Sequence, residues 1–192
     1  LGGCGIQTAA LAFGGYVPPG STVSSATEEY DGSTWTTSPG SLGTARYGLG
    51  SAGIQTSALA FGGYTTTGVA NTEEYDGTSW TVTGSLAVAR SRIGGAGTRP
   101  AALAIGGYPD QTSTEEFNRS ADVVTAAAWA SAPALNSARS SIASGNIGTS
   151  TSTLAVGGDT PSATNLTEEY DGSSWTVQNV NPASLSNRGV AG

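Results

Sequence analysis

The chain contains no lysine, no histidine and no methionine, and Cys4 is its only cysteine. Without histidine it lacks the commonest general base and the commonest metal ligand. A Ser-His-Asp triad and a Cys-His nucleophile are both excluded, and zinc or copper sites lose their usual ligands. A single cysteine forms no disulfide within the chain, so we expect Cys4 to be a small buried residue near the start of a strand. We therefore predict no enzymatic activity, no metal and no cofactor.

Charge is also scarce. Only 11% of the residues are charged, against about 25% in an average soluble protein. The net charge is −7, and seven arginines without a lysine provide no basic stripe for phosphates. No run approaches the ~20 apolar residues of a membrane span. The composition therefore argues against a nucleic-acid partner and against a membrane partner.

One pattern is present four times: an apolar run ending in two glycines, then two glutamates, then a tryptophan, then an arginine. The glycines are Gly14, Gly15, Gly62, Gly63, Gly106, Gly107, Gly157 and Gly158. The glutamate pairs begin at Glu28, Glu73, Glu115 and Glu168. The tryptophans are Trp35, Trp80, Trp129 and Trp175, and the arginines are Arg46, Arg90, Arg139 and Arg188. The tryptophans are 45, 49 and 46 residues apart, a period typical of propeller blades.

Each repeat contains four strand-like pieces. In residues 46–89, a glycine-rich piece is followed by Ser57 to Gly63, which is apolar or small on both faces, then by strands at 71–75 and 80–83. A four-stranded antiparallel sheet with two apolar faces must pack against neighbouring sheets. We predict an all-β, single-domain β-propeller over residues 1–192, with blades of 44–51 residues near 1–45, 46–89, 90–138 and 139–187. Residues 188–192 resemble the start of a further strand, so we expect the four blades to be part of a larger propeller or assembly.

The order Gly-Gly, Glu-x-Tyr-Asp, Trp and Arg resembles the kelch repeat. The resemblance covers essentially the whole chain and is close in Glu28 to Trp35, Glu73 to Trp80 and Glu168 to Trp175. The third repeat differs, because it has Phe117-Asn118 for Tyr-Asp and 13 residues from the second Glu to Trp, against 6 elsewhere. The resemblance implies a kelch-type propeller. It does not extend to the copper enzymes of the galactose oxidase type, whose metal site needs histidine.

Neighbouring residues of a strand point to opposite faces, so the two glutamates of a pair cannot act on one substrate. We expect one glutamate of each pair to meet an in-register arginine or backbone donors between blades, because buried charge needs a partner. The Asp-Gly pairs at Asp31, Asp76 and Asp171 are predicted to form turns that precede the packing tryptophans.

The loop from the second to the third strand varies most, with 13, 10, 8 and 10 residues from the glycine pair to the first glutamate. Variable loops on a fixed scaffold commonly carry recognition. The residues directly after the glycine pairs are Tyr16, Tyr64, Tyr108 and Asp159, and Pro109 and Asp110 make the third loop distinctive. Exposed tyrosines could stack on sugars or peptides, although each could instead only cap its own blade.

Three hypotheses follow. The first is a non-enzymatic binding or structural module that recognises a receptor or glycan on an extracellular or virion surface, as in viral or phage fibre proteins. The second is an intracellular kelch adaptor that binds a protein. The third, an enzyme of the galactose oxidase class, lacks the necessary ligands and bases. We expect a protein or glycan ligand on the variable loop face, and a homo-oligomer or larger assembly.

Overall fold

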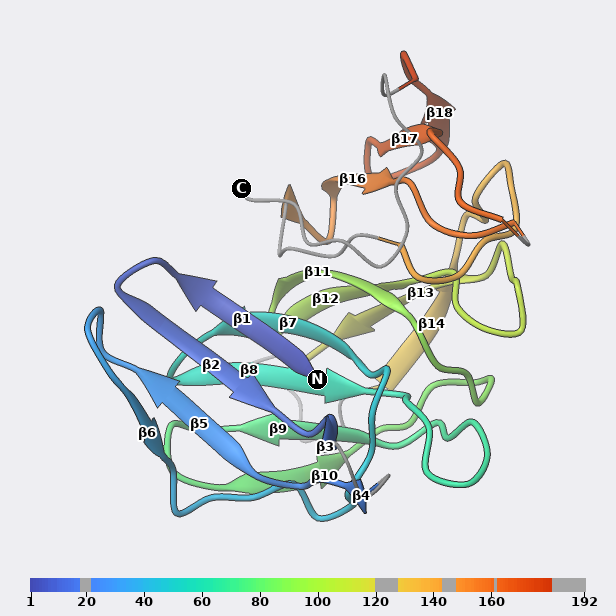
Figure 1. Cartoon of the computed structure of the whole chain (residues 1–192). Helices are drawn as coiled ribbons and strands as arrows, with labels where there is room; N and C mark the ends of the chain where they lie inside the picture. The colour runs from blue at the N-terminus through green and yellow to red at the C-terminus, as the bar shows by residue number, and fades with distance from the viewer. Residues whose placement is uncertain (18–21, 120–127, 143–147, 161, 181–192) are drawn as a thin grey trace.

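The computed structural model describes residues 1–17, 22–119, 128–142, 148–160 and 162–180, and this part of the chain contains strands and no helix (Figure 1). Residues 120–127, which belong to the longer segment between the second Glu and Trp129 of the third repeat, lie outside the described residues, as does the fourth arginine, Arg188. The strands form four antiparallel sheets of four strands each and one small hairpin. The all-β prediction is therefore confirmed.

Each sheet contains one sequence repeat. The first has β1 (Gly2–Ile6), β2 (Ala9–Phe13), β5 (Thr27–Tyr30) and β6 (Trp35–Thr37), with β3 (Tyr16–Val17) and β4 (Thr22–Val23) forming the hairpin beside it. The second has β7 (Gly50–Ile54), β8 (Ser57–Phe61), β9 (Thr72–Tyr75) and β10 (Trp80–Thr83). The third has β11 (Gly94–Thr98), β12 (Ala101–Ile105), β13 (Thr114–Asn118) and β14 (Ala128–Ala132). The fourth has β15 (Gly148–Thr149), β16 (Ser152–Val156), β17 (Thr167–Tyr170) and β18 (Trp175–Val177).

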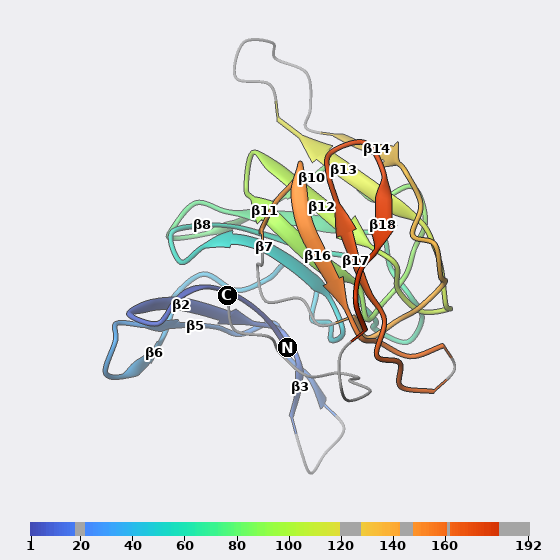
Figure 2. The same cartoon turned by 90° about the horizontal axis from the view of Figure 1, so that it is seen from above.

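The sheets follow one another in chain order, with their faces packed together (Figure 2). The glycine-rich first strands β1, β7, β11 and β15 are neighbours from sheet to sheet. Glycine permits this close approach: a Cβ at Gly95 in β11 would overlap the carbonyl oxygen of Ser51 in β7. The outer strands β6, β10, β14 and β18 make no comparably close contacts with one another, so the sheets approach most closely at their first strands.

Three apolar clusters fill the spaces between successive sheets. Leu11 and Phe13 meet Ala58, Ala60 and Tyr75 between the first and second sheets. Equivalent clusters around Phe61 with Phe117, and around Leu103 with Tyr170, lie between the next two pairs of sheets. Each cluster also contains a leucine of the segment that links the sheets, namely Leu42, Leu86 and Leu135. The core is thus a series of similar interfaces, as expected for a repeat array.

Candidate functional site

Tyrosines line one edge of the stack. Tyr16, in β3, is 50% exposed, and its ring lies 5.6 Å from that of Tyr47. Tyr47 in turn lies 5.4 Å from Tyr64, the equivalent of Tyr16 in the second repeat. Tyr16 and Tyr47 meet edge to face at an interplanar angle of 67°, an arrangement that aromatic pairs prefer, and Tyr47 and Tyr64 are tilted by 52°. Tyr16, Tyr47 and Tyr64 therefore form one continuous aromatic surface, which we call the tyrosine row.

Backbone hydrogen bonds hold the residues after the glycine pairs. Tyr47 and Tyr64 exchange two N–H···O bonds of 3.1 and 2.8 Å. Ser91 makes the same reciprocal pair with Tyr108, and Ser140 makes it with Asp159. The side chains of Tyr64, Tyr108 and Asp159 therefore project from equivalent, fixed points of three successive sheets.

A second set of backbone bonds runs from sheet to sheet beside this edge. The N–H of Arg92 donates to the carbonyl of Gly48, and the N–H of Ser141 donates to the carbonyl of Arg92, at 2.6 and 3.0 Å. Gly48, Arg92 and Ser141 occupy equivalent positions and all have φ between 52° and 60°. Non-glycine residues seldom adopt this left-handed conformation, which is often found at functional sites. The Arg92 guanidinium lies 5.4 Å from the centre of the Tyr108 ring, within cation–π range.

The structure brings together some of the predicted binding residues and separates others. Tyr16 and Tyr64 are joined through Tyr47, whereas Tyr108, which is 51% exposed, lies beside Arg92. Asp159 lies at the equivalent point of the fourth sheet, paired with Ser140. Pro109 and Asp110 form an exposed turn directly after Tyr108.

Sequence reasoning missed Tyr47 and Arg92. Both closely follow a repeat arginine, Tyr47 by one residue and Arg92 by two. Their position between the linker and the first strand was the signal that could have identified them, because those positions run along the same edge as the glycine pairs.

The repeat arginines and the first glutamates form buried ion pairs. Arg46 lies 3.1 Å from Glu73, Arg90 lies 2.8 Å from Glu115, and Arg139 lies 3.0 Å from Glu168. In each case the other carboxylate oxygen, Oε2, accepts the backbone N–H of the residue three places before the arginine. The contacts through Oε1 are charge pairs without hydrogen-bond alignment. Burial lowers the pKa of all three guanidinium groups, and the partner carboxylate opposes that change.

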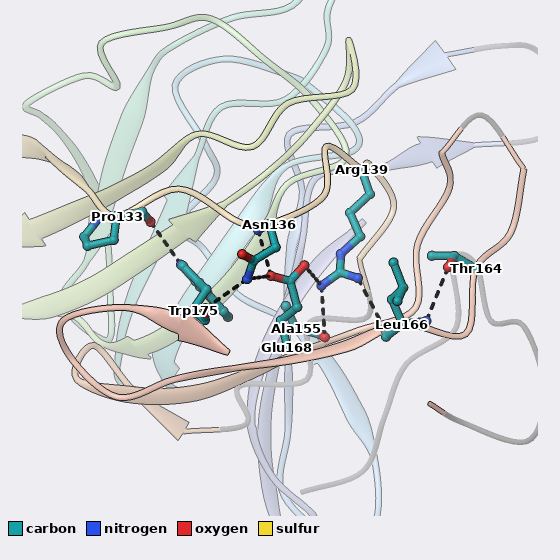
Figure 3. Close-up of polar contacts among 8 residues, drawn as sticks. All are labelled: Pro133, Asn136, Arg139, Ala155, Thr164, Leu166, Glu168 and Trp175. Atoms are coloured by element: carbon teal, nitrogen blue, oxygen red, sulfur yellow. Dashed lines mark hydrogen bonds and ion pairs between the residues drawn. The ribbon is translucent and has the colours of Figure 1, made fainter. Parts of the chain in front are cut away.

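Figure 3 shows this arrangement in the fourth repeat. Glu168 lies between Arg139 and Asn136, and the Asn136 side chain also donates to the Trp175 carbonyl at 2.9 Å. Arg139 donates to the carbonyl of Ala155 at 3.3 Å. Arg139, in the linker before the fourth sheet, thus binds the second and third strands of that sheet, β16 and β17.

The second glutamates bind the next sheet. The Tyr75 hydroxyl donates to Glu29 at 2.6 Å, and the Tyr170 hydroxyl donates to Glu116 at 3.0 Å. Desolvation and the bonded carboxylate raise the pKa of Tyr170 to about 12. The two glutamates of a pair therefore act on opposite faces, as the strand geometry requires.

The aspartates of the Asp-Gly turns bind their own turns. Asp31 Oδ1 accepts the backbone N–H groups of Ser33 and Thr34 at 2.8 Å each. Asp76 and Asp171 make the same contacts. Hydrogen bonds from the turn hold the pKa of all three carboxyls below the usual range, to about 2 for Asp171. Cys4 is buried, as predicted, and burial raises the pKa of its thiol to about 12.

Most acids of the repeats thus bind other groups of the chain: their own turns, the linker arginines or the next sheet. Within the described ranges, no group of three or more His, Cys, Asp and Glu side chains is placed to hold a metal ion. No described helix is long and apolar enough to cross a membrane. The chain matches no protein-family model, and it matches no curated protein. Tyr16, Arg92 and Tyr108 are exposed, and Tyr47 and Tyr64 are partly exposed, along the edge described above.

Proposed function

We propose that this chain is a non-enzymatic recognition module, built as a kelch-like propeller array, that binds a glycan through the tyrosine row. The single observation that carries this proposal is the continuous ring contact from Tyr16 through Tyr47 to Tyr64 across two sheets. A row of rings of this kind offers a rigid surface on which successive sugars can stack.

Polar groups beside the row support a sugar ligand. The exposed Arg92 guanidinium provides several N–H donors in a fixed fork, which suit hydroxyl or carboxylate oxygens. Tyr108 adds a half-exposed ring next to it. A glycan chain has alternating apolar faces and oxygen atoms, and it would use both kinds of group.

The propeller assignment is supported by the repeat period, by the four-stranded sheets and by the adjacency of their glycine-rich first strands. A low content of charge and the lack of lysine suit an exposed surface protein, and we propose an extracellular or virion-surface location. An intracellular adaptor for a protein partner is the competing role.

A glycan array that includes neutral and acidic glycans tests the proposal. We expect wild type to bind one glycan class, and Tyr64→Ala and Tyr16→Ala to weaken that binding by about tenfold each, which corresponds to about 1.4 kcal/mol of lost contact. Val82→Ala is the matched control, because Val82 is 68% exposed on the outer strand β10, and it should bind as wild type does. Equal binding by the wild type and both tyrosine variants would remove the tyrosine row as the site, and binding to proteins alone would favour the adaptor.

A further inference from the structure

The outward face of the first sheet exposes residues whose equivalents in other sheets are buried. Trp35 is 50% exposed, whereas the equivalent Trp175 is 6% exposed. Glu28 is exposed, whereas Glu73, Glu115 and Glu168 are buried. Alanines, Glu28 and Trp35 line a hollow of about 420 Å³ on this face. No described residue forms an ion pair with Glu28.

The outward face of the fourth sheet is open as well. Leu154 is 40% exposed, whereas the equivalent leucines are 0–1% exposed: Leu11, Leu59 and Leu103. Glu169, the second glutamate of the fourth pair, is exposed, and among the described residues its carboxylate accepts a hydrogen bond from Gln178, directly after β18. Its equivalents Glu29 and Glu116 both bind a tyrosine of the following sheet.

The internal interfaces show what covers such faces. At each one, the leucine face of one sheet packs on the face of the next sheet that carries alanines, the tryptophan and a tyrosine, or Phe117 in the third sheet. Two kinds of polar contact accompany this packing, and both are present between the first and second sheets. A tyrosine hydroxyl donates to a second glutamate, as in Tyr75 to Glu29, and a side chain from a hairpin tip donates to a backbone carbonyl, as in Gln55 to Tyr30 at 2.7 Å.

One of the two open faces has the donor groups of these contacts, and the other has the acceptor groups. The first sheet provides Tyr30 and the hairpin-tip residue Gln7, which is equivalent to Gln55. The fourth sheet provides Glu169 and the backbone carbonyl of Tyr170.

We propose that the open face of the first sheet binds the open face of the fourth sheet of a second copy of this chain, with the Tyr30 hydroxyl donating to Glu169 of that copy. The contact is head-to-tail, since different surfaces of the two copies meet. It goes beyond the recognition function, because it uses the sheet faces and leaves the tyrosine row exposed. Each added copy would extend the row of recognition edges and thereby provide multivalent binding.

Cross-linking between introduced cysteines tests the pairing directly. Tyr30→Cys and Glu169→Cys variants are prepared separately, mixed and treated with a short bismaleimide. We expect a mixed product between the two variants, formed at least about tenfold faster than the product of either variant alone, because only the mixture places position 30 opposite position 169. Val82→Cys, on the outer strand β10, is the control for random collision. Native Cys4 stays in place, since it is buried.

Sedimentation at increasing concentration complements the cross-linking. Wild type should associate, and Tyr30→Phe should weaken association by about tenfold without changing the unfolding midpoint of the dilute chain. A Tyr30→Cys, Glu169→Cys double variant that cross-links only within one molecule would overturn the proposal in favour of closure by the chain's own fourth sheet. Monomers at every concentration, with no selective mixed product, would overturn it as well.

Discussion

The buried arginines contribute to stability in a way that depends on their partners. Arg46, Arg90 and Arg139 have fully buried side chains, and each is matched by one carboxylate. A buried pair gains little net free energy relative to apolar residues, because both charges lose their hydration. Removing one partner is costly, because the other charge remains buried without compensation.

Glu115→Gln should therefore lower the free energy of unfolding by about 3 kcal/mol, since it leaves the Arg90 guanidinium without its counter-charge. Urea denaturation followed by tryptophan fluorescence measures the change. The matched control is Glu28→Gln, the same substitution at the equivalent exposed position, which should change stability by less than about 0.5 kcal/mol in dilute solution. A large loss at Glu28 with none at Glu115 would contradict this interpretation.

The aspartate turns predict how stability depends on acid. Because the pKa of Asp171 falls from 3.8 to about 2 on folding, the folded chain binds its proton less readily than the unfolded chain. Its stabilising contribution is present above about pH 4 and is lost as the pH falls toward 2. The melting temperature of wild type should exceed that of Asp171→Ala near neutral pH, and the two curves should converge below about pH 2. A constant difference across that range would show that the carboxylate charge is not involved.

At the scale of the element, the third repeat replaces one inter-sheet contact with another. Phe117 stands where the other repeats have tyrosine, so it cannot donate to Glu74. Instead, Arg119 at the end of the same sheet binds Glu74 at 2.6 Å, and Arg99 lies 3.6 Å from it. The arginines thus satisfy a carboxylate that a tyrosine hydroxyl satisfies between the other sheets.

Arg119→Ala should cost about 1 kcal/mol or less, because the Arg119 side chain is 48% exposed and the ion pair is screened by solvent. In a Phe117→Tyr background the same substitution should cost less, because the new hydroxyl can donate to Glu74. A double-mutant cycle measured by urea denaturation checks this coupling. Independent, additive effects would mean that the two groups do not share the carboxylate.

Much of the strand order could be predicted from the sequence, because each repeat shows the same short apolar pieces and turns. The opposite roles of Glu73 and Glu74 also followed from strand geometry alone. The contacts between sheets could not be predicted in this way, because Tyr75 and Glu29 are 46 residues apart and only the stacking of the sheets brings them together. The tyrosine row was predicted in part: Tyr16 and Tyr64 stood out after the glycines, whereas Tyr47 joins them only through the folded edge.

At the scale of the whole molecule, one interface is repeated between successive sheets. In each sheet, one face carries the leucine and the second glutamate, which are paired in register on neighbouring strands. The opposite face carries the first glutamate, the tryptophan and a tyrosine, or Phe117 in the third sheet. Stability in such an array comes mainly from contacts between neighbours. The same stacking aligns the edges of the sheets, and this alignment creates the tyrosine row.

A double-mutant cycle between sheets tests the stacking most directly. Glu116→Gln and Tyr170→Phe, which remove one bond between the third and fourth sheets, should show a coupling energy of about 1–2 kcal/mol in urea denaturation. The control cycle combines Glu29→Gln with Tyr170→Phe, whose sheets are not neighbours, and should be additive within about 0.5 kcal/mol. Additivity in the first cycle, or equal coupling in both, would contradict a face-to-face stack of sheets in chain order.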